Sequence, residues 1–286
     1  MSGWKAWTVV AAADRVAREQ TLEHLAERGF VVTSHEVSRD GPWRIEIYGD
    51  GDRSPVRGAI DAGWHWEDLP DKDWVAENQR SFRPFAVGPF WVYPSHVADG
   101  RPTGLLPLRI DAGLAFGTGT HATTRGCLEL LATLDPSETA NAVDVGCGSG
   151  ILAIAMAKLW RRPVLGGDND AEAAAVAEEN AGLNGVGTLC RFVVASGLQA
   201  PEIAARAPYD LIVANILAGP LVDLAPSFAQ AVRPGGRVLL SGLLVEQAAL
   251  ILSTYARCGL IFEHRLDLET GGAWWRSLLL RREFLE

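Results

Sequence analysis

The stretch that decides the fold is Val-Asp-Val-Gly-Cys-Gly-Ser-Gly at residues 143–150. An apolar run ends there in glycines spaced G-x-G-x-G, and the apolar residues 151–159 follow with helical spacing. Glycines between a strand and a helix let the backbone approach a ligand closely, because no side chain intervenes. Dinucleotide-binding folds and methyl-transferring folds both use such a turn, so the turn alone leaves the ligand open.

The residues around this turn favour one ligand over the other. Asp168 ends the next apolar run, where an acidic side chain can accept hydrogen bonds from both ribose hydroxyls of an adenosine. Asp144, just before the turn, is placed to receive a cofactor's amino group. The glycine spacing also differs from the G-x-G-x-x-G of nicotinamide-binding folds. We therefore expect S-adenosylmethionine as the cofactor, with Gly146 and Gly148 among the residues that bind it.

Outward from the turn, short apolar runs alternate with helical patterns. The predicted strands cover residues 142–145, 164–167, 191–195, 210–214 and 237–241, and the predicted helices cover 151–159, 171–183, 221–232 and 245–258. Short apolar strands that alternate with helices predict a parallel, doubly wound α/β sheet. Ligands of such sheets bind beyond the carboxyl ends of the strands, where Asp168 and Asn215 fall.

Asn215 ends the run Asp-Leu-Ile-Val-Ala-Asn-Ile-Leu-Ala-Gly-Pro at residues 210–220. In amine- and amide-modifying methyltransferases, an Asn or Asp at this point starts an N/D-P-P-Y/F type motif. A lysine amine has a pKa near 10.4, so the amine must lose a proton before its lone pair can attack a methyl group. The Asn215 oxygen can accept the amine N–H and aim the lone pair without stabilising the ammonium form. A role as a simple turn former is the alternative.

A third motif covers residues 111–124, Asp-Ala-Gly-Leu-Ala-Phe-Gly-Thr-Gly-Thr-His-Ala-Thr-Thr. Its glycines predict a loop able to fold over a cofactor, and its end predicts a helix start with free N–H groups. No second His, Cys or carboxylate stands at ligand spacing from His121, so we expect a capping histidine and no metal site.

The N-terminal part has a different character. Residues 1–49 carry a β-α-β-β pattern, which is part of a ferredoxin-like unit, and the polar, glycine-rich residues 50–66 predict a linker to a catalytic domain over 67–286. Seven of the ten tryptophans precede residue 92, and a buried core is the first explanation for them, with a contact surface for a partner as the alternative.

Composition limits the class of protein. The 286 residues carry a formal net charge of −9, which disfavours direct nucleic-acid binding and attracts a basic partner. The four cysteines form no C-x-x-C pair, no apolar window is long enough to span a membrane, and the N-terminus lacks a signal-peptide pattern. No coiled-coil or repeat pattern favours assembly. We expect a soluble, cytoplasmic monomer.

Several motifs taken together resemble the ribosomal protein L11 methyltransferase family. They are the Gly-Leu-Ala-Phe-Gly-Thr-Gly-Thr-His loop at 113–121, the turn at 144–152, the run 215–221, Pro-Gly-Gly-Arg at 234–237 and Leu-Ser-Gly at 240–242. The likeness implies a class I methyltransferase fold and N-methylation of a large-subunit ribosomal protein, at lysine ε-amines and the N-terminal α-amine, with S-adenosylmethionine. It also implies that Thr124, Gly146, Asp168 and Asn215 contact the cofactor, that Asn215 faces the amine as the catalytic residue, and that Phe116 covers the methionine end.

The sequence departs from the family pattern at two points. Ala122 stands where the family usually has proline, and residues 1–49 supply only part of the family's ferredoxin-like substrate-recognition domain. The second departure keeps a methyltransferase for another protein or a small amine as the alternative. A nicotinamide-dependent oxidoreductase and a non-enzymatic adenosine-binding module are the remaining hypotheses.

Overall fold

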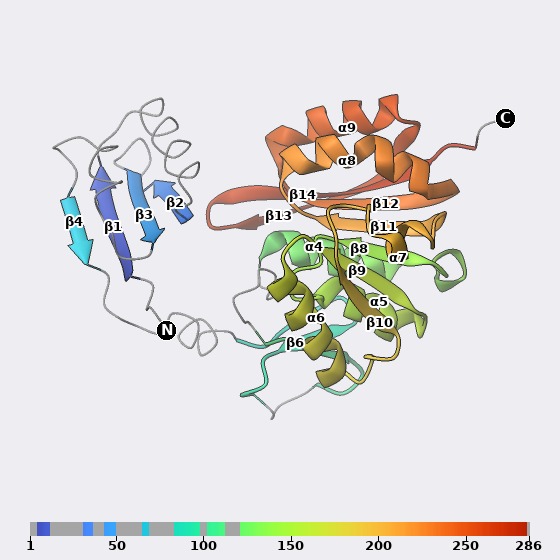
Figure 1. Cartoon of the computed structure of the whole chain (residues 1–286), viewed down its shortest axis with the longest axis horizontal. Coiled ribbons are helices and arrows are strands. Elements are labelled where there is room, and N and C mark those ends of the chain that lie inside the picture. Colours follow the sequence, from blue (N-terminus) through green and yellow to red (C-terminus); the bar gives the residue numbers. More distant parts are fainter. Residues whose placement is uncertain are drawn as a thin grey trace. The chain divides into compact units, whose positions relative to one another are not determined.

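The computed structural model describes residues 5–11, 31–36, 43–49, 65–68, 83–97, 102–111 and 121–284 (Figure 1). The chain divides into two compact units, Met1–Trp74 and Val75–Glu286.

The C-terminal unit contains a seven-stranded sheet in the order β10-β9-β8-β11-β12-β14-β13. The first five strands of this order pair in parallel, whereas β14 is antiparallel to both of its neighbours. The strands are β8 (Ala142–Val145), β9 (Val164–Asp168), β10 (Cys190–Val194), β11 (Tyr209–Asn215), β12 (Val232–Leu244), β13 (Leu260–Thr270) and β14 (Ala273–Arg282). This arrangement is the doubly wound α/β sheet that the sequence predicts.

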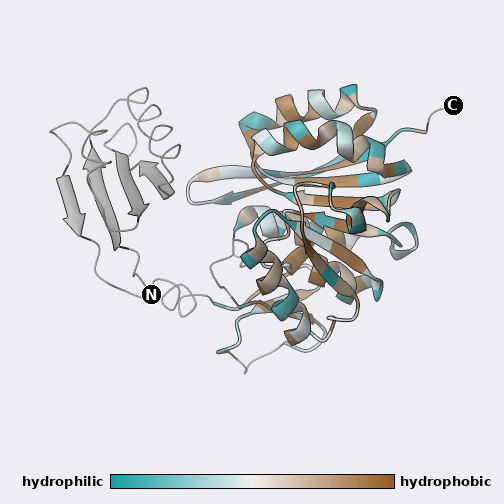
Figure 2. Cartoon of the chain, in the orientation of Figure 1, coloured by the Kyte–Doolittle hydropathy of each residue, from teal (hydrophilic) through white to brown (hydrophobic). Residues whose placement is uncertain are grey.

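Helices cover both faces of the sheet (Figure 1). The helical segments are α4 (Ala122–Thr133), η1 (Pro136–Glu138), α5 (Ile151–Trp160), α6 (Ala171–Leu183), α7 (Pro201–Ala204), α8 (Ala218–Ala231), η2 (Val245–Gln247) and α9 (Ala248–Arg257). Successive strand residues point to opposite faces, so Leu211 and Val213 join the core under α4 and α5, while Ile212 packs on the α8 and α9 side. Figure 2 shows the resulting concentration of hydrophobic residues along the strands.

A small three-stranded sheet, not predicted from the sequence, precedes α4. Its strands β5 (Phe85–Val87), β6 (Phe90–Tyr93) and β7 (Leu106–Arg109) are three or four residues long, too short for a clear periodic pattern. Phe90 and Leu108 are fully buried and extend the core beneath α4 and α5. The segment therefore belongs to the hydrophobic core of the C-terminal unit.

The N-terminal unit contains a four-stranded antiparallel sheet, not the three strands predicted. Its order is β2-β3-β1-β4, with β1 (Lys5–Ala11), β2 (Val31–Glu36), β3 (Trp43–Gly49) and β4 (His65–Asp68). Strand β4 pairs with β1 and falls in the range predicted as linker and start of the catalytic domain. This corrects the expectation of a partial sheet. The sequence His-Trp-Glu-Asp is short and three of its residues are polar, so only its pairing with β1 identifies it as a strand. The helix predicted over residues 14–28 lies outside the described residues.

Two further elements differ from prediction. The hairpin β13–β14 follows the last predicted helix, where no strand was expected. Helix α8 begins at Ala218, before the predicted start at 221, because Pro220 occupies its first turn, where a missing N–H costs no helical hydrogen bond. In the part of the chain that the structure describes, no helix has the length and apolar character needed to span a membrane.

Candidate active site

The glycine turn between β8 and α5 has the geometry that the sequence predicts. Gly146, Gly148 and Gly150 have φ angles of 71°, 51° and 78°, which are left-handed values that glycine adopts without steric cost. The N–H groups of Gly146 and Cys147 both donate to the Gly167 carbonyl of β9, at 2.8 and 3.1 Å. The turn is therefore held at the carboxyl edge of the sheet.

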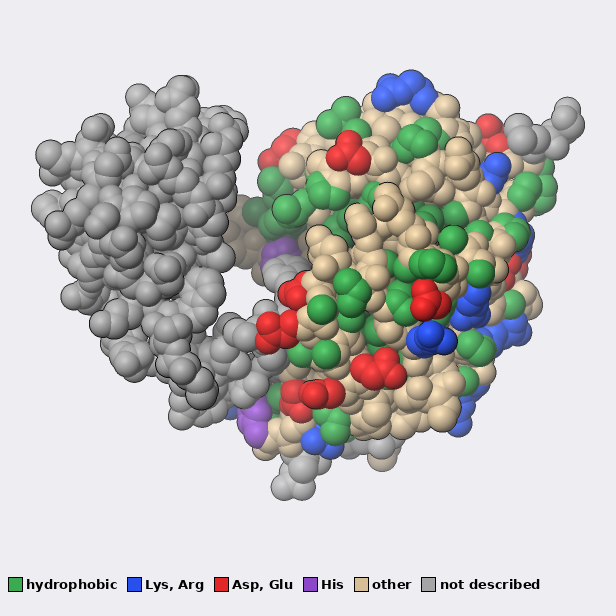
Figure 3. All heavy atoms as spheres, in the orientation of Figure 1, with side chains coloured by type: hydrophobic (Ala, Val, Ile, Leu, Met, Phe, Trp, Pro, Cys, Tyr) green, Lys and Arg blue, Asp and Glu red, His purple; other side chains and the backbone are tan. Residues whose placement is uncertain are grey.

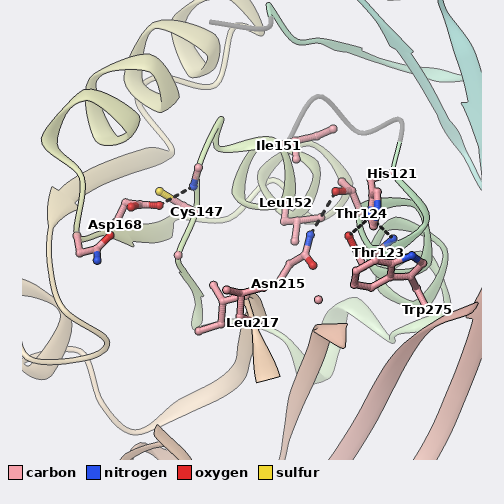
Figure 4. Close-up of a pocket in the computed structure, with 15 residues that line it drawn as sticks. His121, Thr123, Thr124, Cys147, Ile151, Leu152, Asp168, Asn215, Leu217 and Trp275 are labelled. Carbon is pink, nitrogen blue, oxygen red and sulfur yellow. Dashed lines mark hydrogen bonds between the residues drawn. The ribbon is translucent and has the colours of Figure 1, made fainter. Parts of the chain in front are cut away.

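Asp168 lies at this edge, at the end of β9. Its Oδ2 accepts a hydrogen bond from the Gly148 N–H at 2.8 Å, and its Oδ1 accepts one from the Asp170 N–H at 3.1 Å. Each carboxylate oxygen has a further lone pair for a ligand. The carboxylate therefore faces the turn in a fixed orientation (Figure 4).

Asn215 reaches the same space from the end of β11. Its Nδ2 donates to the Thr124 hydroxyl of α4 at 3.2 Å, which fixes the amide plane. Its Oδ1 is buried and accepts no hydrogen bond from any described residue. A buried carbonyl oxygen without a donor is costly, so this atom is suited to receive a donor from a bound molecule.

The backbone after Asn215 is enclosed by two glycines. A Cβ at Gly146 would lie 2.3 Å from Ile216 Cγ2, and a Cβ at Gly242 of β12 would lie 2.2 Å from the Ile216 carbonyl oxygen. Both glycines have positive φ angles. Close packing of the glycine turn and of β12 on Ile216 therefore sets the position of Asn215.

His121 is a capping residue, as predicted. It is the N-cap of α4, and its Nδ1 accepts from the Thr123 N–H at 3.4 Å. Its ring contacts the Trp275 ring edge-on, with centroids 4.6 Å apart. Burial lowers the pKa of His121, which favours the neutral ring that this cap requires. The described residues contain no group of three or more side chains able to hold a metal ion.

These elements enclose a cavity of about 580 Å³. Figure 4 shows Asp168 and Cys147 on one side, Thr124, His121 and Trp275 on the other, and Asn215 between them. The lining residues are His121, Thr123, Thr124, Gly146, Cys147, Gly148, Ile151, Leu152, Asp168, Asn169, Asn215, Ile216, Leu217, Gly242 and Trp275. Five of the predicted site residues thus line one cavity, namely Thr124, Gly146, Gly148, Asp168 and Asn215. Phe116 lies outside the described residues.

A second hollow of about 460 Å³ adjoins the first. The two share Gly146, Asn169, Ile216 and Leu217, and the second continues along the residues after β10 to Ser196. The combined space has room for an elongated ligand.

Sequence reasoning missed several residues of this site. Trp275 comes from the β13–β14 hairpin, and no local pattern connects it with the glycine turn. Leu217, the N-cap of α8, is 71% exposed, which places an apolar side chain at the cavity mouth. Asn169 directly follows Asp168, and its position at the end of a strand was the one sequence feature that could have indicated a place in the site.

Asp144 does not line the cavity, although the sequence placed it next to the cofactor. Its side chain is buried, and its Oδ2 accepts from the Ala153 N–H in the first turn of α5 at 3.1 Å. Burial raises its pKa from 3.8 to about 7, and the Asp168 charge acts in the same direction. Asp144 therefore supports the turn from beneath.

This buried carboxyl predicts a pH dependence of stability. Because the folded-state pKa is raised, the unfolded chain ionises first, and the folded chain loses stability as pH rises from about 4 to about 7. Asp144→Asn keeps an acceptor for the Ala153 N–H and should remove this loss of stability. The free energy of unfolding of the variant should therefore exceed that of the parent by an amount that grows as pH rises from about 4 to about 7. Urea unfolding at a series of pH values measures the difference. The exposed Asp170→Asn is the control, and equal pH slopes for both variants would contradict the role of burial.

Comparisons with known proteins agree with this geometry. The family model described as ribosomal protein L11 methyltransferase (PrmA) matches residues 56–282. A Brucella abortus protein named ribosomal protein L11 methyltransferase is 39% identical over 269 residues, which cover 90% of this chain and 94% of that protein. A Rhodopseudomonas palustris protein of the same name is 44% identical over 219 residues, 76% of this chain and 73% of that one.

A solved structure is also similar. The ribosomal protein L11 methylase from Lactobacillus delbrueckii subsp. bulgaricus has a TM-score of 0.60 and 32% identity, covering 71% of this chain and 100% of that chain. The family model and the Brucella relative each cover most of the sequence, and the residues matched by the family model include the cavity and the glycine turn. The chain therefore belongs to the ribosomal protein L11 methyltransferase family and is a methyltransferase that uses S-adenosylmethionine.

Proposed function

We propose that this chain transfers methyl groups from S-adenosylmethionine to lysine ε-amino groups, and to the N-terminal α-amino group, of ribosomal protein L11. The observation that carries the proposal is the Asn215 side chain, whose nitrogen is fixed by Thr124 while its oxygen is buried without a donor. The names of the relatives supply the substrate.

The cavity residues fit the cofactor. The Asp168 carboxylate retains lone pairs for two ribose hydroxyls, and the backbone of Gly146 and Gly148 leaves room where side chains would intrude. Thr124 and Asn215 would bound the other end of the space. S-adenosylmethionine supplies an electrophilic methyl group on a sulfonium centre.

The chain's own contribution to the reaction is to orient the amine. A lysine amine is neutral in only about one molecule in a thousand near pH 7.4, because its pKa is near 10.4. The Asn215 oxygen can accept an N–H of the neutral amine, and an amide, unlike a carboxylate, adds no charge that favours the ammonium form. Trp275 and Leu217 offer apolar surface to the aliphatic part of a lysine chain at the cavity mouth.

Charge around the cavity favours a basic substrate. Exposed Asp170 and Glu172 begin α6 beside the cavity, and exposed Asp223 lines the adjoining hollow. Acidic side chains are visible on the face of the unit shown in Figure 3. A field of this sign would attract a lysine-rich protein and speed its encounter with the site.

The N-terminal unit is proposed to recognise the protein substrate. Its strand order β2-β3-β1-β4, antiparallel throughout, is that of a ferredoxin-like sheet. We assign substrate recognition to this unit and methyl transfer to the rest of the chain, in a monomer that acts in the cytoplasm without direct nucleic-acid contact. Sedimentation of the purified chain, alone and with L11, tests whether the chain is a monomer.

One labelling experiment tests the reaction and the substrate together. The chain is incubated with methyl-labelled S-adenosylmethionine and ribosomal proteins from cells lacking this enzyme, and the label is mapped by mass spectrometry. Label on L11 amines is the expected result. Label on another protein or on a small amine would show that L11 is not the substrate. If no label appears although the cofactor binds, the chain would be an adenosine-binding module without methyltransferase activity.

Asp168 should contribute to cofactor affinity rather than to turnover. Asp168→Ala is expected to raise the Kd for S-adenosylmethionine about tenfold or more, since charge-assisted hydrogen bonds are each worth roughly 1.5–3 kcal/mol. Titration calorimetry measures the change, with Asp170→Ala as the neighbouring acidic control. An unchanged Kd would remove Asp168 from the cofactor site.

A further inference from the structure

The glycine turn is supported by a side chain from α6 that the reaction does not otherwise use. Asn180 is 2% exposed, and its Nδ2 donates to the Ser149 carbonyl of the turn at 2.9 Å. Its Oδ1 accepts from the Asp111 N–H at 3.3 Å. One buried amide therefore joins the turn to the chain that follows β7.

The bond from Asn180 to the Ser149 carbonyl stands in the place of a regular helical hydrogen bond. In a regular helix start, the Ala153 N–H would bond to this carbonyl, but here that N–H donates to Asp144 Oδ2. The next bond, from Ile154 N–H to the Gly150 carbonyl at 2.9 Å, is the first regular one of α5. Asp144 and Asn180 thus satisfy the two backbone groups on either side of the turn.

Packing independently brings α6 against the same turn. A Cβ at Gly150, whose φ is +78°, would lie 2.8 Å from the Ala177 Cβ. Ala177 precedes Asn180 by almost one helical turn, so both residues face the glycines from one side of α6. The backbone of the turn therefore has little freedom to move away from Asn180.

Asn184, one turn further along α6, has a different role. Its Oδ1 accepts from the Arg109 N–H at 3.0 Å, and its Nδ2 donates to the Arg109 carbonyl at 2.6 Å and to the Asn180 carbonyl within α6 at 2.8 Å. The two bonds to Arg109 pair it with β7 in the way a neighbouring strand would, and none of the three reaches the glycine turn. Asn184 is thus a matched control on the same helix.

We propose that Asn180 is a positioning residue that sets the backbone of the glycine turn for S-adenosylmethionine. The inference rests on the proposed function, in which this turn binds the cofactor. Without Asn180, the turn loses the buried hydrogen bond that α6 donates to the Ser149 carbonyl, and its backbone is held less firmly in this position. Cofactor affinity then falls, whereas the orientation of Asn215, fixed from α4, is retained.

The test measures the Kd for S-adenosylmethionine, kcat at saturating cofactor and Tm in full-length variants. Asn180→Ala removes both bonds, and Asn180→Asp keeps an acceptor for Asp111 while losing the donor to Ser149. Both should raise the Kd about tenfold and change kcat at saturation by less than about threefold. Asn184→Ala should lower Tm to a similar extent and leave the Kd within about twofold of the parent. If Asn180→Ala does not fold, Asn180→Asp carries the comparison.

The outcomes separate the two proposals. An unchanged Kd in Asn180 variants whose Tm falls would overturn the positioning role, while the proposed function would stand. An equal rise in Kd for Asn184→Ala would also overturn it, because general loosening of α6 would then be the cause. Failure of the parent chain to bind S-adenosylmethionine would overturn both proposals.

Discussion

Asn215→Ala is expected to lower kcat by about 100-fold or more while changing the Kd for S-adenosylmethionine by less than about threefold. The side chain has one buried oxygen without a donor, and the loss of that oxygen removes the group proposed to aim the amine. The cofactor would keep its contacts with the glycine turn and Asp168. Single-turnover rates at saturating cofactor, together with calorimetric titration, measure the two quantities separately.

Thr124 provides a second variant for the same idea. Its hydroxyl holds the Asn215 nitrogen at 3.2 Å, so Thr124→Val should free the amide to rotate and lower kcat by about tenfold. Thr124→Ser keeps the hydroxyl and should retain most of the activity.

Equal losses of kcat and cofactor affinity in Asn215→Ala would contradict an aiming role and make Asn215 a cofactor-binding residue only.

Gly242→Ala is expected to impair both stability and turnover. Its φ of +85° is left-handed, which costs a residue with a Cβ about 1–2 kcal/mol. The added Cβ would also lie 2.2 Å from the Ile216 carbonyl oxygen and 2.7 Å from its carbon. These are backbone atoms next to Asn215, so relief of the clash must displace the segment that carries Asn215, and we expect kcat to fall by about tenfold or more.

The chain offers a matched control for this substitution. Gly259 has a φ of +79°, yet a Cβ there meets no atom within 4 Å. Gly259→Ala should therefore show the conformational cost alone, seen as a lower midpoint in urea unfolding with kcat unchanged. If the two variants lost stability and turnover equally, the close contact with Ile216 would be irrelevant to the site.

Family membership decides among the hypotheses that the glycine turn left open. Nicotinamide binding and methyl transfer share the turn, and Asp168 would bind an adenosine ribose in either case. The Gly-Leu-Ala-Phe-Gly-Thr-Gly-Thr-His loop supplied the resemblance, and the family model matching residues 56–282 supports methyl transfer.

The strands that the sequence predicts well are those buried on both faces. Residues 142–145 are apolar apart from Asp144, and the predicted strand there matches β8 because a strand covered by helices on both sides has few polar positions. The hairpin β13–β14 escaped prediction because most of β13 is exposed or half-buried and both strands carry several charged residues. Strand β4 escaped because it has only four residues, three of them polar, and it is recognisable as a strand only by its pairing with β1.

By itself, the sequence determined the doubly wound sheet, the glycine turn and the three strand ends that carry Asp144, Asp168 and Asn215. Each of these depends on local periodicity and on the rule that parallel strands end at one edge. Only the tertiary structure decided that Asp144 supports the turn from below, that Gly242 and Trp275 reach the cavity, and that Asn180 bonds to Ser149. These contacts join residues far apart in the chain, and their geometry is set by packing between elements, which no local pattern encodes.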